Sequence, residues 1–491
     1  MFEVQISDTE TKHHVTKNLV VIDAHSHVGA DEEKIQNLNP MAASGTIDFY
    51  KRIYHKYLLE ENKSIHLPSS ALFNVDDEEK EYEIKFKVSP SSLVKNVLDD
   101  LAENCKCGLH KSANEIFENS WLIDLGVIFP FHDTFRNRMP EAEYRASNIN
   151  IHRNISSYPG ALRFIGFMRL NPQMGIDKVK TELDFGVGLG LRGVKLHPRS
   201  DLWLDDINTD EMVSTMVEAA RRDLPVILDT RGRKTIDDIF ALVNRTLPKL
   251  GNIPGKKLKV IIAHCAHGHI GDKEVYDILA HPNIYGEISM LHGDAVKKFY
   301  KEFANHYKRK DFHKKTGIPL SKKILFGSDF PFLQEHHALY NLQYLTSESF
   351  FTRVGTLNDL QNILGKSLLD LLRPKNDVWK EAKRKSYETT AFYSSQREEV
   401  NVSSQTAEQK LSAELVSLFE EYSHITHLDY LYYNDDETKG DISLTFRDKA
   451  WSEFCECNAI IFAKDHLAAL TGESTKNNNV LFESEFQKKI V

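Results

Sequence analysis

Histidine and aspartate side chains stand at the ends of apolar runs in this sequence. His25 and His27 follow the apolar run Leu19–Asp23. Asp329 follows the run Lys323–Phe326. Alternate residues of a β-strand point to one face, so the two imidazoles are expected to face the same side. Neutral imidazole is a common metal ligand, and Asp329 is expected to reach the same ion. The alternatives are histidines bonded to backbone or water and an aspartate that caps a loop.

His264 is a third candidate imidazole. It follows the run Leu258–Ala263 and has the strand parity of Val260 and Ile262. A buried histidine without a polar partner costs free energy, so we expect His264 to belong to the same cluster.

Two further runs end in charged residues. Lys195 and His197 share one face of a predicted strand. If that face points inward, Lys195 is a charge partner, a substrate clamp or, when carboxylated, a bridge between two metal ions; the alternative is a lysine that reaches solvent. Asp229 is a candidate metal ligand, and Arg231 is a candidate for holding an anionic substrate group. Asp229 and Arg231 could instead form ion pairs.

The elements that must position these residues are short apolar runs rich in β-branched residues. After the second run, most follow at about the 30-residue step of a βα unit. Eight such units predict an α/β protein with a (β/α)8 or TIM barrel, whose active site lies at the carboxyl ends of the strands. The runs are Leu19–Asp23, Leu122–Phe129, Arg163–Leu170, Leu191–Leu196, Pro225–Leu228, Leu258–Ala263, Ile284–Ile288 and Lys323–Phe326.

The chain of 491 residues exceeds a bare barrel of about 250 residues. We predict a barrel over residues 1–374, with a long insertion after the first strand at about 31–118. A helix is predicted over Leu357–Leu372, and the proline that follows ends it. Residues 375–491 are predicted to be a linker and a mainly helical C-terminal extension of unknown role.

Composition narrows the class of protein. The charged fraction of 27% and the hydrophobic fraction of 41% are typical of globular proteins. The sequence shows no secretion signal and no long apolar segment, and five cysteines do not suggest a disulfide framework, so a cytoplasmic protein away from membranes is expected. A net charge of −9 without a basic run predicts no nucleic-acid partner. A small-molecule substrate is expected, and a homo-oligomer is possible.

Six segments together resemble the amidohydrolase superfamily, in its amidohydrolase-related branch of metal-dependent hydrolases and nonoxidative decarboxylases. The resemblance covers roughly residues 18–373. The segments are VIDAHSH at 21–27, RFIGFMRLNP at 163–172, GVKLHP at 193–198, VIIAHCAHG at 260–268, GSDFP at 327–331 and ILGKSLLDLL at 363–372.

The resemblance implies that His25 and His27 are metal ligands, that His264 is the histidine of the sixth strand and that Asp329 is the aspartate of the eighth. This sequence departs from the family in the fifth strand, where members usually carry a histidine ligand and this chain has Asp229. An oxygen ligand there suits zinc and also manganese.

The residues and the resemblance together predict a metal-dependent hydrolase. His25, His27, Asp329 and Asp229 would hold one divalent ion, with zinc favoured and two ions expected if Lys195 is carboxylated. Asp329 and His264 would be the catalytic acid and base for cleavage of an amide, ester or lactone bond. The alternatives are a nonoxidative decarboxylase of an unsaturated or aromatic acid and an inactive barrel that serves as a scaffold.

Overall fold

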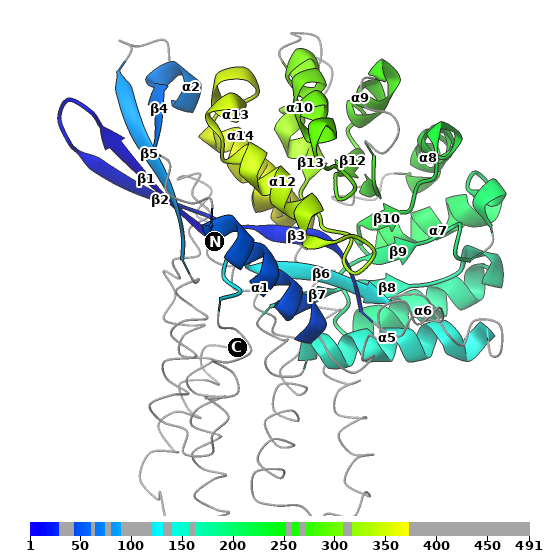
Figure 1. Cartoon of the computed structure of the whole chain (residues 1–491). Helices are drawn as coiled ribbons and strands as arrows, with labels where there is room; N and C mark the ends of the chain where they lie inside the picture. The colour runs from blue at the N-terminus through cyan, green and yellow to red at the C-terminus, as the bar shows by residue number, and fades with distance from the viewer. Residues whose placement is uncertain are drawn as a thin grey trace, which may run out of the picture.

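Parallel strands flanked by helices make up most of the described part of the chain (Figure 1). The computed structural model describes residues 1–28, 44–59, 64–73, 80–89, 119–130, 140–156, 163–201, 203–251, 258–265, 272–307 and 317–372.

The parallel strands form two ladders. The first ladder contains β3 (Ile22–Val28), β6 (Leu125–Pro130) and β7 (Phe164–Gly166). The second contains β8 (Met168–Arg169), β9 (Val194–Leu196), β10 (Val226–Leu228), β11 (Val260–Ile262), β12 (Ile284–Glu287) and β13 (Ile324–Leu325). Each predicted apolar run therefore contains or adjoins one strand of the ring, with the third run split between β7 and β8.

Backbone hydrogen bonds join the two ladders at both ends. Phe167 lies between β7 and β8, and its N–H donates to the Ile128 carbonyl at 2.9 Å, so β7 and β8 continue one strand. On the other side, the Ala24 N–H donates to the Phe326 carbonyl at 2.9 Å and the Asp329 N–H donates to the His25 carbonyl at 2.8 Å. These bonds connect β3 to the segment after β13, and the predicted (β/α)8 barrel is confirmed.

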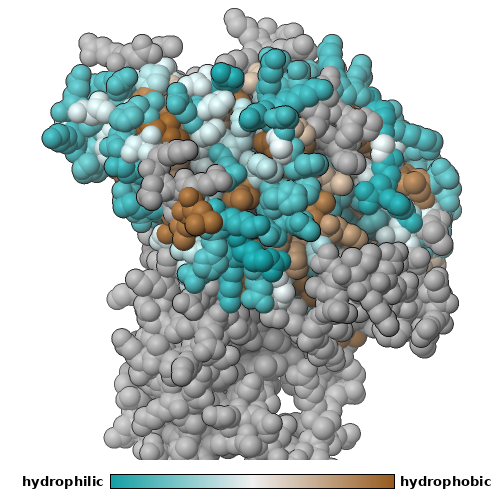
Figure 2. Space-filling model, viewed as in Figure 1, coloured by the Kyte–Doolittle hydropathy of each residue, from teal (hydrophilic) through white to brown (hydrophobic). Residues whose placement is uncertain are grey.

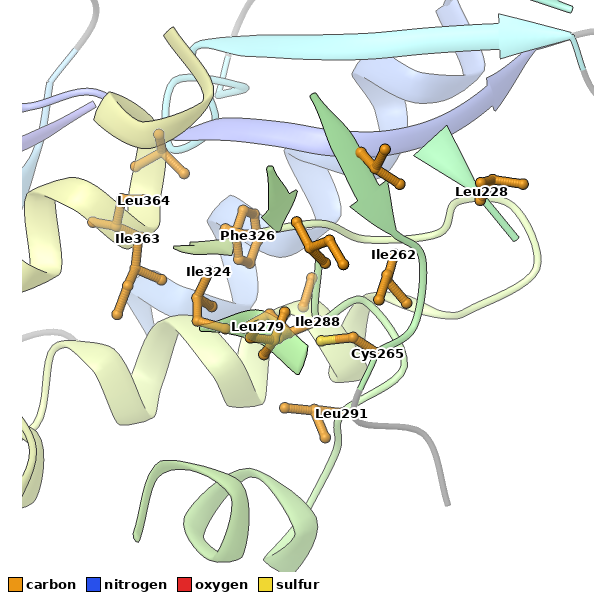
Figure 3. Packing of buried hydrophobic residues seen from close by; sticks show 14 of the residues in the cluster. Leu228, Ile262, Cys265, Leu279, Ile288, Leu291, Ile324, Phe326, Ile363 and Leu364 are labelled. Atoms are coloured by element: carbon orange, nitrogen blue, oxygen red, sulfur yellow. The ribbon is translucent and has the colours of Figure 1, made fainter. Parts of the chain in front are cut away.

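Apolar side chains fill two regions, one on each face of the ring. Val226 and Leu228 pack outward in the cluster shared with the helices, whereas Ile227 belongs to a smaller cluster built from alternate residues of the strands, which fills the interior. Figure 3 shows part of the outer cluster, where Ile324 and Phe326 lie near Ile363 and Leu364 of the last helix. The period of two along each strand decides which residues reach the interior.

Amphipathic helices cover the outside of the ring. In α7, Thr209 caps the first turn through its side chain, and the buried residues recur at helical spacing. The covering helices are α5 (Pro140–Ser156), α6 (Ile176–Gly188), α7 (Asp210–Arg221), α8 (Arg233–Thr246), α9 (Lys273–Leu279), α10 (Asp294–Tyr307), α12 (Glu335–Leu345) and α13 (Glu348–Arg353).

The predicted helix 357–372 is also present, in three parts: α14 (Leu357–Gln361), a π-helical turn (Asn362–Lys366) and α15 (Ser367–Leu372). Gly365 lies in the π-helical turn, where an added Cβ would come within 2.7 Å of the Val20 carbonyl oxygen. This close approach holds the last helix against the start of β3.

A four-stranded antiparallel sheet at one side of the barrel is the largest feature that the sequence did not predict (Figure 1). The N-terminal hairpin of β1 (Phe2–Asp8) and β2 (His14–Leu19) pairs through β1 with β5 (Glu81–Val88), which pairs with β4 (Ile65–Pro68). Thus the described part of the predicted insertion supplies two strands, and also α1 (Ser44–Leu58) and α2 (Ser69–Phe73). Helix α1 packs against α12.

The described surface is mainly hydrophilic in the view of Figure 2, with small separate hydrophobic patches. None of the described helices combines the length and the apolar character needed to cross a membrane. Residues 375–491 and the cysteines at 105, 107, 455 and 457 lie outside the described residues.

Candidate metal centre

Three predicted ligand atoms converge at the carboxyl ends of the first and last barrel strands. The Nε2 atoms of His25 and His27 lie 3.2 Å apart, and Asp329 Oδ1 lies 3.3 Å from the first and 3.4 Å from the second. Two ligands at about 2.05 Å from a tetrahedral zinc ion are separated by roughly 3.3 Å. The triangle therefore has the dimensions of three ligands around one ion, and all three residues are buried.

Local backbone irregularities aim these side chains. The pairing of β3 with β6 shifts register between Asp23 and Ser26, which brings His25 to the interior face together with Ala24 and His27. Asp329 adopts a positive φ of 55°, a left-handed conformation that is uncommon outside glycine. Strain of this kind is typical of functional sites.

Asp23 fixes the turn that carries Asp329. Its Oδ1 accepts the Ser328 N–H at 2.8 Å, and its Oδ2 accepts hydroxyl protons from Ser328 at 2.5 Å and Ser26 at 2.8 Å. Burial raises the pKa of Asp23 to about 6, although these hydrogen bonds oppose the rise. Asp23, which precedes both predicted histidine ligands, thus joins the two strands that carry the site.

The electrostatics of the triangle suit a cation. Burial, followed by the nearby Lys195 ammonium, lowers the pKa of His25 well below its usual value, which leaves a neutral imidazole able to act as a ligand. Burial alone would raise the pKa of Asp329, but the neighbouring His264, His25 and His27 outweigh it and the pKa is lowered. The carboxylate is therefore held in its charged form.

Lys195 points into the barrel, which is the inward of the two orientations considered from the sequence. Its Nζ lies 3.1 Å from His25 Nε2 and 4.7 Å from the centre of the Phe129 ring. Burial lowers the pKa of Lys195 even though the carboxylates of Asp229, Asp329 and Glu287 oppose the change. The snorkelling alternative is excluded, because only 1% of the residue is exposed.

Asp229 lies at the centre of a second group at the rim. Its Oδ1 is 3.2 Å from His264 Nε2, and its Oδ2 is 3.5 Å from His197 Nδ1 and 3.6 Å from Arg231 Nε. Burial would raise the pKa of Asp229, but His197 and His264 hold it well below its usual value. Arg231 is the most open of these residues, with about a third of its side chain exposed.

His264 reaches the rim for a reason other than the predicted one. Val260 and Ile262 pack outward, whereas Ile261 and Ala263 fill the interior, so the parity argument was wrong. Strand β11 ends at Ile262, and His264 itself has a φ of +54°, which turns its side chain inward. Its Nε2 also lies 3.9 Å from Asp329 Oδ2.

Glu287, at the end of β12, is the principal residue that the sequence analysis missed. It is completely buried, and its Oε1 lies 2.9 Å from His25 Nδ1 and 2.7 Å from the His264 backbone nitrogen. The signal was present, because a carboxylate at the end of an apolar strand in the run Ile284–Ile288 calls for a partner.

Comparison with protein families agrees with the resemblance found in the sequence. Residues 133–350 match the family model described as amidohydrolase. The match bears out the predicted resemblance to the amidohydrolase superfamily over this part of the chain. No curated protein gives a significant match to the chain.

Solved structures show weak overall likeness. A 2,6-dihydroxybenzoate decarboxylase from Rhizobium is 13% identical, covering 72% of this chain and 98% of that one with a TM-score of 0.39. A dihydroxybenzoic acid decarboxylase from Polaromonas sp. JS666, with bound manganese, is 14% identical over 72% and 97%, with a TM-score of 0.40. An amidohydrolase from Burkholderia multivorans is 9% identical over 72% and 100%, with a TM-score of 0.37. Scores this low carry no argument about the reaction.

The donor atoms at the carboxyl ends of the strands fit a divalent ion. His25, His27 and Asp329 form one set of ligand atoms within 4.8 Å of one another, and His25, His264 and Glu287 form another. Asp229 belongs to neither set, and its buried carboxylate oxygens contact His264, His197 and Arg231. Two neutral imidazoles and a charged carboxylate whose atoms converge within ligand distance are a donor set that suits zinc and similar ions.

Proposed function

We propose that this protein is a metal-dependent hydrolase that adds water to an amide, ester or lactone bond of a small molecule. The convergence of His25, His27 and Asp329 within 3.2 to 3.4 Å carries the proposal. Asp229 is a further ligand in this proposal. A divalent ion at these residues supplies Lewis acidity, which lowers the pKa of water toward about 7.

Asp329 and His264 are proposed to carry out proton transfer and carbonyl polarisation. Asp329 accepts the proton of the attacking water and returns it to the leaving group, because its carboxylate is buried, charged and part of the cluster. His264 Nε2 faces the same space as Asp229 and Asp329, and in its doubly protonated form the ring donates a hydrogen bond from Nε2 to the substrate carbonyl oxygen.

Three cationic or polar side chains are proposed to bind the substrate. Lys195 and His197 line the buried end of the site, and Arg231 stands at its open side. The planar guanidinium of Arg231 suits a carboxylate or phosphate group of the substrate. We propose zinc as the ion, with manganese as the alternative because Asp229 adds an oxygen donor.

Nonoxidative decarboxylation is the second candidate. It is favoured by the buried Lys195 ammonium beside His25, which would neutralise a substrate carboxylate. Product analysis separates the two reactions, since a decarboxylase releases carbon dioxide and consumes no water.

An inactive scaffold is the least favoured function. His25 and Glu287 are completely buried and Lys195 nearly so, and burying these groups costs stability that a scaffold has no reason to sacrifice.

Metal analysis of the purified protein tests the proposal. We expect close to one equivalent of zinc or a similar ion, and two equivalents if Lys195 is carboxylated. Removal of the ion with a chelator should abolish turnover across a panel of amides, esters and lactones, and added metal should restore it. A protein that binds no divalent ion and gains no activity when metal is added would contradict the proposal.

A further inference from the structure

Glu287 connects two histidines that have different tasks in the proposed function. Its Oε1 lies 2.9 Å from Nδ1 of His25, the imidazole whose Nε2 belongs to the ligand triangle. The same oxygen accepts the His264 backbone N–H at 2.7 Å and the Ser289 hydroxyl proton at 3.2 Å, while Oε2 accepts the Ser289 N–H at 2.9 Å. Both oxygens of this carboxylate therefore act as acceptors.

The hydrogen bond to His25 determines its tautomer. Glu287 offers only acceptor lone pairs, so the proton of a neutral His25 ring must reside on Nδ1. Nε2 is then left with its lone pair directed at His27 and Asp329. A carboxylate behind a ligating histidine is a known way to orient the ring and to raise its basicity.

Ser289 extends the same control to His264. Ser289 Oγ lies 2.8 Å from His264 Nδ1, and the single hydroxyl proton of Ser289 is already directed to Glu287. Glu287 Oε1 also lies 3.3 Å from His264 Nδ1, and an ionised carboxylate oxygen only accepts, so this contact and the Ser289 oxygen together favour a proton on His264 Nδ1. Proton exchange by His264 is thereby confined to Nε2, the atom that faces Asp229 at 3.2 Å.

Gly327 provides the space that Glu287 occupies. A Cβ added at Gly327 would lie 2.7 Å from Glu287 Oε2 and 3.2 Å from the His25 Cβ. The glycine of the GSDFP segment is thus required by the packing of Glu287 between β12 and the turn that carries Asp329.

We propose that Glu287 is a positioning residue that holds a proton on Nδ1 of both His25 and His264, by direct contact at both rings and also through Ser289 at the second. We place Glu287 behind the ligand triangle rather than in it, because it contacts His25 through Nδ1, on the opposite side of the ring from Nε2. The inference rests on the proposed metal site for its consequences, but its tautomers can be measured without metal.

The first test is ¹⁵N spectroscopy of histidine-labelled, metal-free protein at alkaline pH, with signals assigned from His25→Ala and His264→Ala. We expect the Nδ1–H tautomer at both histidines in the natural protein. Glu287→Gln should remove the preference at both residues, and Ser289→Ala should weaken it at His264 alone, because Glu287 Oε1 still lies 3.3 Å from His264 Nδ1. Unchanged tautomers in Glu287→Gln would overturn the inference, whatever the protein is found to catalyse.

The second test is zinc affinity by competition with a chelator. Glu287→Gln should weaken zinc binding by about 10 to 100-fold, whereas Ser289→Ala should leave it unchanged because the His25 contact remains. If the two variants lost zinc affinity equally, Glu287 would not act on His25 independently of Ser289. If the natural protein binds zinc and Glu287→Gln binds it equally well, this inference fails while the proposed function stands.

Two further variants guard against a merely structural effect. Glu218→Gln removes another buried carboxylate, which pairs with Arg221 and Arg222 in α7, and should leave zinc affinity and both tautomers unchanged. If Glu287→Gln does not fold, Glu287→Asp keeps the charge but shortens the reach to His25, and it should still weaken zinc binding. Natural zinc affinity in a folded Glu287→Asp variant would overturn the inference.

Discussion

Two buried lysines at opposite ends of the barrel show how its two rims differ. Lys323 precedes β13, and its ammonium donates to the backbone carbonyls of His281, Pro282 and Ile284 at 2.9 to 3.3 Å. Lys195 lies in β9, and its ammonium meets His25 Nε2 and the face of Phe129. One charge is satisfied by the main chain, whereas the other is placed among titratable side chains.

The difference separates stability from chemistry. At the amino ends of the strands, the Lys323 ammonium joins the loop before β12 to the start of β13 through backbone carbonyls, which stabilises the fold. At the carboxyl ends, the buried groups are His25, His27, Asp229, His264, Glu287 and Asp329, and two of them have left-handed backbones. Substitutions at the two rims should therefore separate into losses of activity and losses of folding free energy.

The largest expected effect is at Asp329. Asp329→Asn keeps the size of the side chain but removes the base, and turnover should fall by about 10² to 10⁴-fold with little change in the free energy of unfolding. His25→Ala should instead lose the metal and regain part of its activity at high metal concentration. Near-natural turnover of Asp329→Asn on an identified substrate would reassign the base, most simply to His264.

The paired lysine substitutions compare the rims directly. Lys195→Met should lower kcat/KM by about 10 to 100-fold through the loss of a charge-assisted contact, while thermal unfolding changes little. Lys323→Met should leave kcat/KM unchanged but lower the free energy of unfolding by about 2 to 4 kcal/mol, because three carbonyls lose their donor. The same pattern in both variants would show that the two rims do not divide these roles.

The smallest effect is expected from removing residues 375–491. Lys259, just before β11, donates to the Leu371 carbonyl at 2.7 Å and so fixes the end of α15 to the barrel. A chain that ends at Pro374 should therefore keep its zinc affinity and its melting temperature. An insoluble product would mean that the removed residues cover apolar barrel surface.

Alternation along strands made much of the barrel predictable. Ile227 faces the interior, so Asp229, two residues later, faces the interior as well. Val194 and Leu196 pack outward, so Lys195 between them points into the barrel. The location of the runs, the end of the last helix near Leu372 and the family all followed from local patterns of this kind. The cytoplasmic location, the oligomeric state and the role of the C-terminal extension remain predictions.

Local patterns failed wherever a backbone departed from regular geometry or a partner came from far along the chain. The register shift after Asp23 and the left-handed His264 both change which face a side chain reaches, and neither has a sequence period. The pairing of Phe2–Asp8 with Glu81–Val88 joins segments about eighty residues apart, which no local alternation specifies.

The sequence by itself determined the chemistry available at the rim, because side-chain types at the ends of apolar strands fix which ligands, acids and bases can meet. Only the tertiary structure decided how they meet. Glu287 acquires its partners from His25 and His264, which arrive on two other strands, and Gly327 leaves the space for its carboxylate. Hydrogen-bond direction and close approach depend on distances across the barrel, and one-dimensional spacing carries no record of those distances.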